Sequence, residues 1–195
     1  MVAIIEYCIN NASAISNALS ALEIDHVITK NEMDIINADK IILPGSENFH
    51  LSIKMLHLLN LFTQLRVIKK PILGISHGMQ ILCNHSDEGD TSCLGIIDTE
   101  SKMFDETEIK TPHIGLSKIN FTRVSKLFDG IKNNSSFFYH HSYYIPKNKF
   151  TVATSNYGVQ FSAAFEKDRF YGVQFYPERS GKAGLKLIKN FNDIC

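Results

Sequence analysis

The first half of the chain alternates short apolar runs with segments whose apolar residues recur at helical spacing. The apolar runs are residues 2–5, 24–28, 41–43 and 71–75, and the helical patterns cover residues 11–22, 48–68 and about 77–83. Short, continuous apolar runs are typical of strands that are buried on both faces. Because helical segments separate these runs, the pattern predicts an α/β fold with a mostly parallel sheet flanked by helices.

The second half has a different pattern, rich in phenylalanine, tyrosine, valine and isoleucine. These residue types favour strands, and they concentrate in residues 114–123, 135–145, 150–154 and 158–175. Residues 161–165 and 169–175 flank a polar turn and predict a β-hairpin. A last helix is expected at about residues 181–191. The second half therefore predicts an added antiparallel portion that ends in a helix.

The composition narrows the possible functions by exclusion. The chain is 44% hydrophobic and carries 20 basic and 20 acidic side chains, so its formal net charge is zero. A disordered chain would have fewer apolar residues, and a nucleic-acid-binding protein would usually have a basic excess. No apolar stretch approaches the roughly 20 residues that span a bilayer. We therefore expect neither a nucleic-acid nor a membrane partner.

The length and the cysteines predict one domain, residues 1–195, in a reducing compartment. Single domains of about 200 residues are common, and the N-terminus lacks the basic region and the small-residue cleavage site of a signal peptide. The 4 cysteines form no CxxC pair and no zinc-type spacing. The neighbours His140 and His141 lack a third ligand at metal spacing. We expect a cytoplasmic protein with free thiols, no metal and no cofactor.

One turn has the pattern of a nucleophile elbow. Gly74-Ile75-Ser76-His77-Gly78 follows a buried strand and opens a helix, which is the G-x-S-x-G arrangement. Small flanking residues suit a strained turn that projects residue 76 from the sheet, and the helix N-terminus offers N–H groups to an oxyanion. A tight turn with an incidental serine is the alternative interpretation.

Together with this turn, further segments make the chain resemble the class I (triad) glutamine amidotransferases, above all the glutaminase subunits of imidazole glycerol phosphate synthase. The resemblance runs nearly end to end and implies the flavodoxin-like α/β fold of that family. It also implies histidine biosynthesis, in which glutamine is hydrolysed and the ammonia passes to a (βα)8-barrel cyclase subunit of the heterodimer. The resembling blocks are residues 7–11, 43–45, 74–80, 88–89, 112–115, 141–144 and 172–181.

The catalytic triad departs from the family pattern of cysteine, histidine and glutamate. By resemblance, Ser76 stands at the nucleophile position, Tyr176 at the general-base position, and Glu178 is the retained orienting acid. A serine hydroxyl needs a base to become a nucleophile, and tyrosine, with an ordinary pKa of about 10, is a poor base near neutrality. The sequence therefore predicts a chain that is deficient in glutamine hydrolysis, a pseudoenzyme.

The oxyanion segment departs as well. The resemblance places Gly45, Ser46 and His77 at the oxyanion site, but the family pattern Pro-Gly-x-Gly reads Pro44-Gly45-Ser46-Glu47 here. The second glycine lets the backbone turn an N–H towards the oxyanion, and Glu47 lacks that freedom. Like the altered triad, this change predicts deficient glutamine hydrolysis.

The resemblance also assigns binding residues. The glutamine head group would be held by Gln80, Glu88, Ser142 and Tyr143, whose side chains can serve an ammonium and a carboxylate. Asn11, Phe138 and Arg179 match positions near the docking face for the barrel subunit.

Other interpretations remain open from the sequence. The chain can be a paralogous subunit for amidino-sugar synthesis, a serine hydrolase that uses Ser76 with His77, or a non-catalytic subunit that binds glutamine or regulates a partner. Ser76 could result from an engineered change of cysteine to serine, but such a change would not account for Tyr176 and Glu47 as well.

Overall fold

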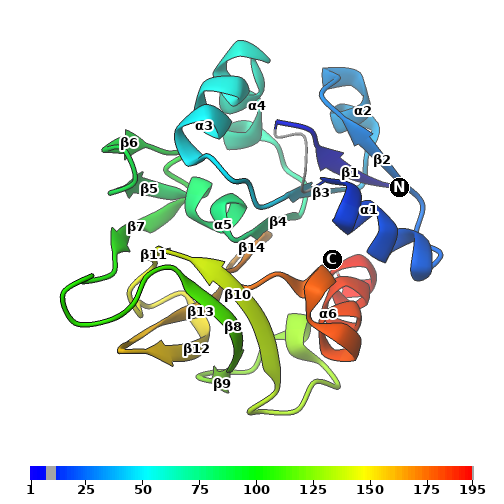
Figure 1. Ribbon diagram of the computed structural model, residues 1–195. Helices are drawn as coiled ribbons and strands as arrows, with labels where there is room; N and C mark the ends of the chain where they lie inside the picture. The colour runs from blue at the N-terminus through cyan, green and yellow to red at the C-terminus, as the bar shows by residue number, and fades with distance from the viewer. Residues whose placement is uncertain (8–11, 195) are drawn as a thin grey trace.

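A computed structural model of the chain describes residues 1–7 and 12–194. Its centre is an eight-stranded sheet with the order β2-β1-β3-β4-β14-β13-β12-β9 (Figure 1). The parallel strands are β1 (Val2–Ile5), β2 (His26–Thr29), β3 (Lys40–Leu43), β4 (Ile72–Ile75) and β14 (Phe170–Val173). The antiparallel extension consists of β13 (Val159–Lys167), β12 (Thr151–Tyr157) and β9 (Asn120–Phe121).

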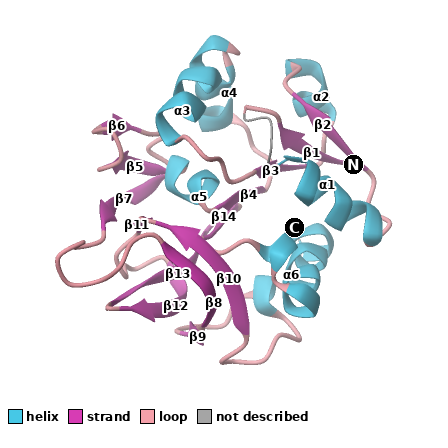
Figure 2. Cartoon of the chain, viewed as in Figure 1, coloured by secondary structure: helices cyan, strands magenta, loops and turns pink. Residues whose placement is uncertain are grey.

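Helices cover both faces of the parallel part (Figure 2). They are α1 (Ala12–Ala21), α2 (Glu32–Asn37), α3 (Phe49–Leu58), α4 (Leu61–Val67), α5 (His77–Ile81) and α6 (Gly181–Ile194). Apolar side chains of α1 and α6 share one buried cluster, and those of α2 to α5 share another. Successive strand residues point to opposite faces, so Ile42 joins the first cluster while Ile41 and Leu43 join the second. The continuous apolar runs therefore supply both cores.

Two smaller sheets and two short 3₁₀ helices complete the chain. The strands β8 (His113–Lys118) and β10 (Ser136–His141) form an antiparallel ribbon. The strands β5 (Cys83–Ser86), β6 (Thr91–Ser92), β7 (Ile97–Met103) and β11 (Tyr143–Tyr144) form the other sheet. The 3₁₀ helices are η1 (Lys126–Phe128) and η2 (Pro177–Arg179). Within the described part of the chain, no helix is long and apolar enough to cross a bilayer.

The structure confirms the predicted fold class and corrects several boundaries. The single helix expected over 48–68 is wrong, because Asn60 adopts a left-handed conformation with φ 57° and separates α3 from α4. The helix expected to reach Cys83 ends at Ile81, and Cys83 begins β5. The strand expected over 24–28 starts at His26. The hairpin is present as β13 and β14, with the turn at Asp168.

The glycines of the elbow are required by close packing between β3, β4 and α5. A Cβ atom on Gly78 would lie 2.0 Å from the carbonyl oxygen of Leu43, and one on Gly74 would lie 2.4 Å from that of Gly78. Both distances are far below van der Waals contact with rigid backbone, so no larger residue fits. This packing lets the chain turn sharply from β4 into α5.

Candidate functional site

Ser76 occupies the strained turn that the sequence pattern predicts. Its φ of 52° and ψ of −113° are rarely adopted by residues with a side chain, and its N–H donates a 2.7 Å hydrogen bond to the carbonyl of Val173 on β14. The residue is only 1% exposed. Its hydroxyl has no hydrogen-bond partner among the described residues. The residue expected as the nucleophile therefore lies on a strained turn, and no described residue is hydrogen-bonded to its hydroxyl.

Tyr176 lies against the oxyanion segment beside Ser76. A Cβ atom on Gly45 would lie 2.8 Å from Cε1 of Tyr176, 3.2 Å from its hydroxyl and 3.3 Å from Cβ of Ser76. The tyrosine ring and the serine therefore meet at the same glycine. The tyrosine is 7% exposed, and its backbone N–H donates a 2.8 Å hydrogen bond to the carbonyl of Phe138. A buried tyrosine therefore occupies the position at which the sequence predicts the general base.

Glu178 lies in η2, two residues after Tyr176, and its carboxylate atom Oε2 is buried without a hydrogen-bond partner among the described residues. Burial raises the pKa of Glu178 to about 7; a hydrogen bond from its own backbone and the charge of Arg179 oppose this only in part. An orienting acid normally has a histidine N–H as its partner. With Tyr176 at that position, Oε2 of Glu178 has no such partner among the described residues, and its burial raises the pKa.

We expect the pH dependence of stability to reveal this unsatisfied carboxyl group. Because its pKa is raised in the folded state, Glu178 contributes stability that is complete below its ordinary pKa of 4.5 and is lost as the pH rises through about 7. Glu178→Gln should therefore gain on the order of 2 kcal/mol of unfolding free energy, relative to the natural chain, between pH 4.5 and pH 8, after allowance for partial exposure. Urea unfolding at a series of pH values measures this difference.

The variant must be compared with the natural chain at each pH, because two buried histidines change stability with pH in the opposite direction. Burial lowers the pKa of His113 to about 4 and that of His141 to about 3. Below about pH 6.5 the unfolded state therefore binds protons that the folded state does not bind, and stability falls. This destabilisation at low pH is common to both chains and cancels in the difference. Glu100→Gln, an exposed change on β7, is the control. A flat difference for Glu178→Gln would contradict the assignment.

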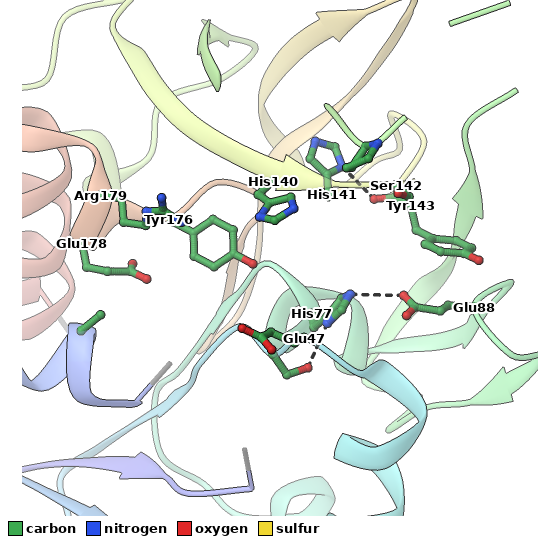
Figure 3. Close-up of a pocket in the computed structure, with 13 residues that line it drawn as sticks. Glu47, His77, Glu88, His140, His141, Ser142, Tyr143, Tyr176, Glu178 and Arg179 are labelled. Atoms are coloured by element: carbon green, nitrogen blue, oxygen red, sulfur yellow. Dashed lines mark hydrogen bonds and ion pairs between the residues drawn. The ribbon is translucent and has the colours of Figure 1, made fainter. Parts of the chain in front are cut away.

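His77 is bound to two neighbours other than Ser76. Its Nδ1 lies 2.9 Å from the hydroxyl of Ser46, and its Nε2 lies 3.2 Å from Oε2 of Glu88 (Figure 3). The hydroxyl of Ser52 donates a further 2.8 Å hydrogen bond to that of Ser46. Both ring nitrogens are thus engaged away from Ser76. This geometry weighs against the dyad of Ser76 and His77 that the sequence left open.

A cavity of about 500 Å³ adjoins these residues. Figure 3 shows Tyr176, Glu178 and Arg179 on one side of it and His77, Glu88 and Tyr143 on the other. Its further lining residues are Ala14, Ser46, Glu47, Pro112, His140, His141 and Ser142. Ala14, Pro112 and His140 were not predicted as site residues. They reach the cavity through the ends of α1, β8 and β10, and sequence patterns do not reveal such long-range proximity.

Of the four residues expected to hold the glutamine head group, three line the cavity and one lies behind it. Glu88, Ser142 and Tyr143 line the cavity, whereas the buried Gln80 does not. The amide of Gln80 donates a 3.0 Å hydrogen bond to the carbonyl of Tyr143 and a 3.2 Å one to Oε1 of Gln174. Gln80 therefore supports the strand segment behind the cavity. Burial and the neighbouring Glu88 raise the pKa of Tyr143, which keeps its phenol neutral.

Two of the three expected interface residues lie together at the edge of the cavity. The guanidinium of Arg179 lies 4.0 Å from the ring centre of Phe138, a cation–π contact. Next to them, Ile114 and Leu116 on β8 are 58% and 67% exposed. The third expected residue, Asn11, lies outside the described residues.

The neighbouring histidines have a structural role. Nδ1 of His113 lies 3.0 Å from Nε2 of His141, and the ring of His113 stacks between Tyr139 and Tyr157. The low pKa values of this pair keep both rings neutral at physiological pH. Across the described residues, no group of histidine, cysteine, aspartate and glutamate is placed to hold a metal ion.

Nearly the whole chain is similar in sequence to imidazole glycerol phosphate synthase subunits HisH. It is 38% identical over 195 residues to the imidazole glycerol phosphate synthase subunit HisH of Bacteroides thetaiotaomicron, with 99% of each chain covered. It is 40% identical over 181 residues to the subunit HisH of Haemophilus influenzae strain Rd, with 93% of this chain and 91% of that protein covered. The subunit HisH of Buchnera aphidicola from Acyrthosiphon pisum is 39% identical over 185 residues, with 94% of each covered.

Solved structures share the fold at lower sequence identity. A crystal structure of a glutamine amidotransferase has a TM-score of 0.73 and 12% identity, with 98% of each chain covered. The structure of PurLQS from Thermotoga maritima has a TM-score of 0.70 and 16% identity, with 98% of this chain and 97% of that chain covered. The family model "glutamine amidotransferase class-I" matches residues 3–194. The chain therefore belongs to the class-I glutamine amidotransferases, and within them to the family of the imidazole glycerol phosphate synthase subunit HisH.

Proposed function

We propose that residues 1–195 form one amidotransferase-like domain that acts as the HisH-type subunit of an imidazole glycerol phosphate synthase in histidine biosynthesis. The observation that carries this proposal is the 38% identity over 195 residues to a HisH subunit, with 99% of each chain covered. The free, buried thiols of Cys83 and Cys93 fit a reducing cytoplasm.

The subunit we propose lacks effective glutamine hydrolysis. Ser76 is buried without a hydrogen-bonded base among the described residues, and Tyr176 packs against Gly45 where a base would be needed. Catalysis by a triad depends on its members acting as a unit, so losing two of them removes most of the rate. Its role is then to stabilise or regulate the partner, while ammonia reaches the partner from solution.

The partner we propose is a (βα)8-barrel cyclase subunit in a heterodimer. The face formed by Ile114, Leu116, Phe138 and Arg179 supports this proposal; we call it the ribbon face. Leu116 and Phe138 are cross-strand partners on β8 and β10, and exposed apolar residues of this kind are typical of interfaces. The ribbon ends at the cavity, which Pro112 and His140 line. A partner on this face would lie over the cavity mouth.

Co-purification with a barrel subunit from the same genome tests this function. We expect a stable heterodimer that forms the imidazole product when ammonium chloride is supplied and not when glutamine is the only nitrogen source. The barrel subunit alone, at the same ammonium concentration, is the control for a stabilising or regulatory effect. A chain that neither binds the barrel subunit nor changes its activity would contradict the proposal.

A further inference from the structure

Tyr176 lines the wall of the cavity, whereas Ser76, the expected nucleophile, is not among the described residues that line it. The ring of Tyr176 and the side chain of Ser76 meet at Gly45, and Figure 3 shows the tyrosine hydroxyl pointing into the cavity from the side of Glu178. A carboxamide carbon that approached Ser76 would need the volume that the phenol ring fills. Tyr176 therefore shortens the space available to a ligand's side chain.

The position of Tyr176 is fixed by contacts on both sides of its backbone. Its N–H donates a hydrogen bond to the carbonyl of Phe138, and the hydroxyl of Ser180 donates a 2.6 Å hydrogen bond to its carbonyl oxygen. The residue is 7% exposed, and its ring abuts the backbone of Gly45. Close packing against this backbone holds the ring beside the elbow.

The opposite end of the cavity remains able to bind a charged head group. Oε2 of Glu88 is buried and lies 3.2 Å from Nε2 of His77. A carboxylate offers about four acceptor sites, so an ammonium group can bind Glu88 beside His77. The hydroxyl of Ser142, which is in the cavity wall, can donate to a carboxylate.

We infer that this pocket binds an amino acid with a short side chain, such as alanine or serine, in preference to glutamine, and that Tyr176 determines this specificity. The inference rests on the proposed function, since it uses the head-group end of a glutamine-type pocket. The free zwitterion offers an ammonium to Glu88 and a carboxylate to the hydroxyl of Ser142. Its short side chain ends before the phenol ring, whereas that of glutamine meets it.

Calorimetry on the full chain with L-alanine, L-serine and L-glutamine tests the inference. We expect the dissociation constants of alanine and serine to be at least about 10-fold lower than that of glutamine, the size of discrimination that one or two methylene-sized groups produce in a filled pocket. Tyr176→Ala should reverse this order, and Tyr176→Phe, which keeps the ring, should not. Glu88→Gln should weaken binding of every ligand.

Each contrary result has a definite meaning. Equal or tighter binding of glutamine by the natural chain, or no binding of any of the three, overturns the inference. If Tyr176→Ala fails to fold by circular dichroism, Tyr176→His, which is also smaller, replaces it, and an unchanged preference there overturns the inference equally. Binding to the barrel subunit is measured in parallel. If the chain binds the barrel subunit but no short amino acid, only the inference is contradicted. If it binds a short amino acid but not the barrel subunit, the proposed function is contradicted.

Discussion

A chain in which Ser76 becomes cysteine and Tyr176 becomes histidine is expected to release glutamate from glutamine at least about 10⁴-fold faster than the natural chain. The scaffold for this gain is present. Residue 76 already has the strained elbow conformation, with φ 52°, and Glu178 already has a buried, unpartnered oxygen that a histidine N–H would satisfy. A histidine ring is smaller than the tyrosine ring, so it would also free part of the space that the tyrosine fills beside Gly45.

The measurement is enzyme-coupled detection of glutamate with the barrel subunit present. The single variants Ser76→Cys and Tyr176→His are the controls, and each should recover only a small part of the gain because a nucleophile and its base act together. Adding Glu47→Gly should raise the rate further, since it restores the flexible position of the oxyanion segment. If the natural chain already hydrolyses glutamine as fast as the double variant, the assignment of a deficient triad is wrong.

Local patterns in the sequence predicted the centre of the fold and missed its edge. Strands such as β1 and β4 are continuous apolar runs because both faces are buried, so they can be recognised without knowledge of their neighbours. The strand β5, with the sequence CNHS, has no such pattern. It is a strand because β6 and β7 pair with it. The break at Asn60 was also hidden, because the apolar spacing continues across it.

In the candidate site, too, local features could be predicted from the sequence, whereas contacts between distant segments could not. The strain at Ser76 follows from the spacing of Gly74 and Gly78, which is local information. The placement of Tyr176 beside Ser76 does not, because residues 45, 76 and 176 meet only through the pairing of β3, β4 and β14. The contacts of His77 with Ser46 and Glu88 likewise join segments that are distant in sequence. Single-sequence reasoning identified the residue types but not which of them touch.

Leu116→Glu on the ribbon face is expected to weaken binding to the barrel subunit at least about 30-fold, which corresponds to a loss of about 2 kcal/mol. Leu116 is 67% exposed in the isolated chain and lies across from Phe138 in the β8–β10 ribbon. If a partner covers this face, a carboxylate at residue 116 must lose its water without gaining a cation, and that cost falls on the complex alone. Isothermal titration of the barrel subunit measures the change.

The matched control is Leu58→Glu on α3, because Leu58 is 64% exposed and α3 lies on the opposite side of the molecule from β8 (Figure 1). Both variants introduce the same charge at an exposed leucine, so both should keep the melting temperature of the natural chain within a few degrees. Only the change at Leu116 should alter the dissociation constant. Equal binding by the two variants would place the docking face elsewhere, and equal weakening would point to an effect of net charge, because a change in global charge acts on encounter from any part of the surface.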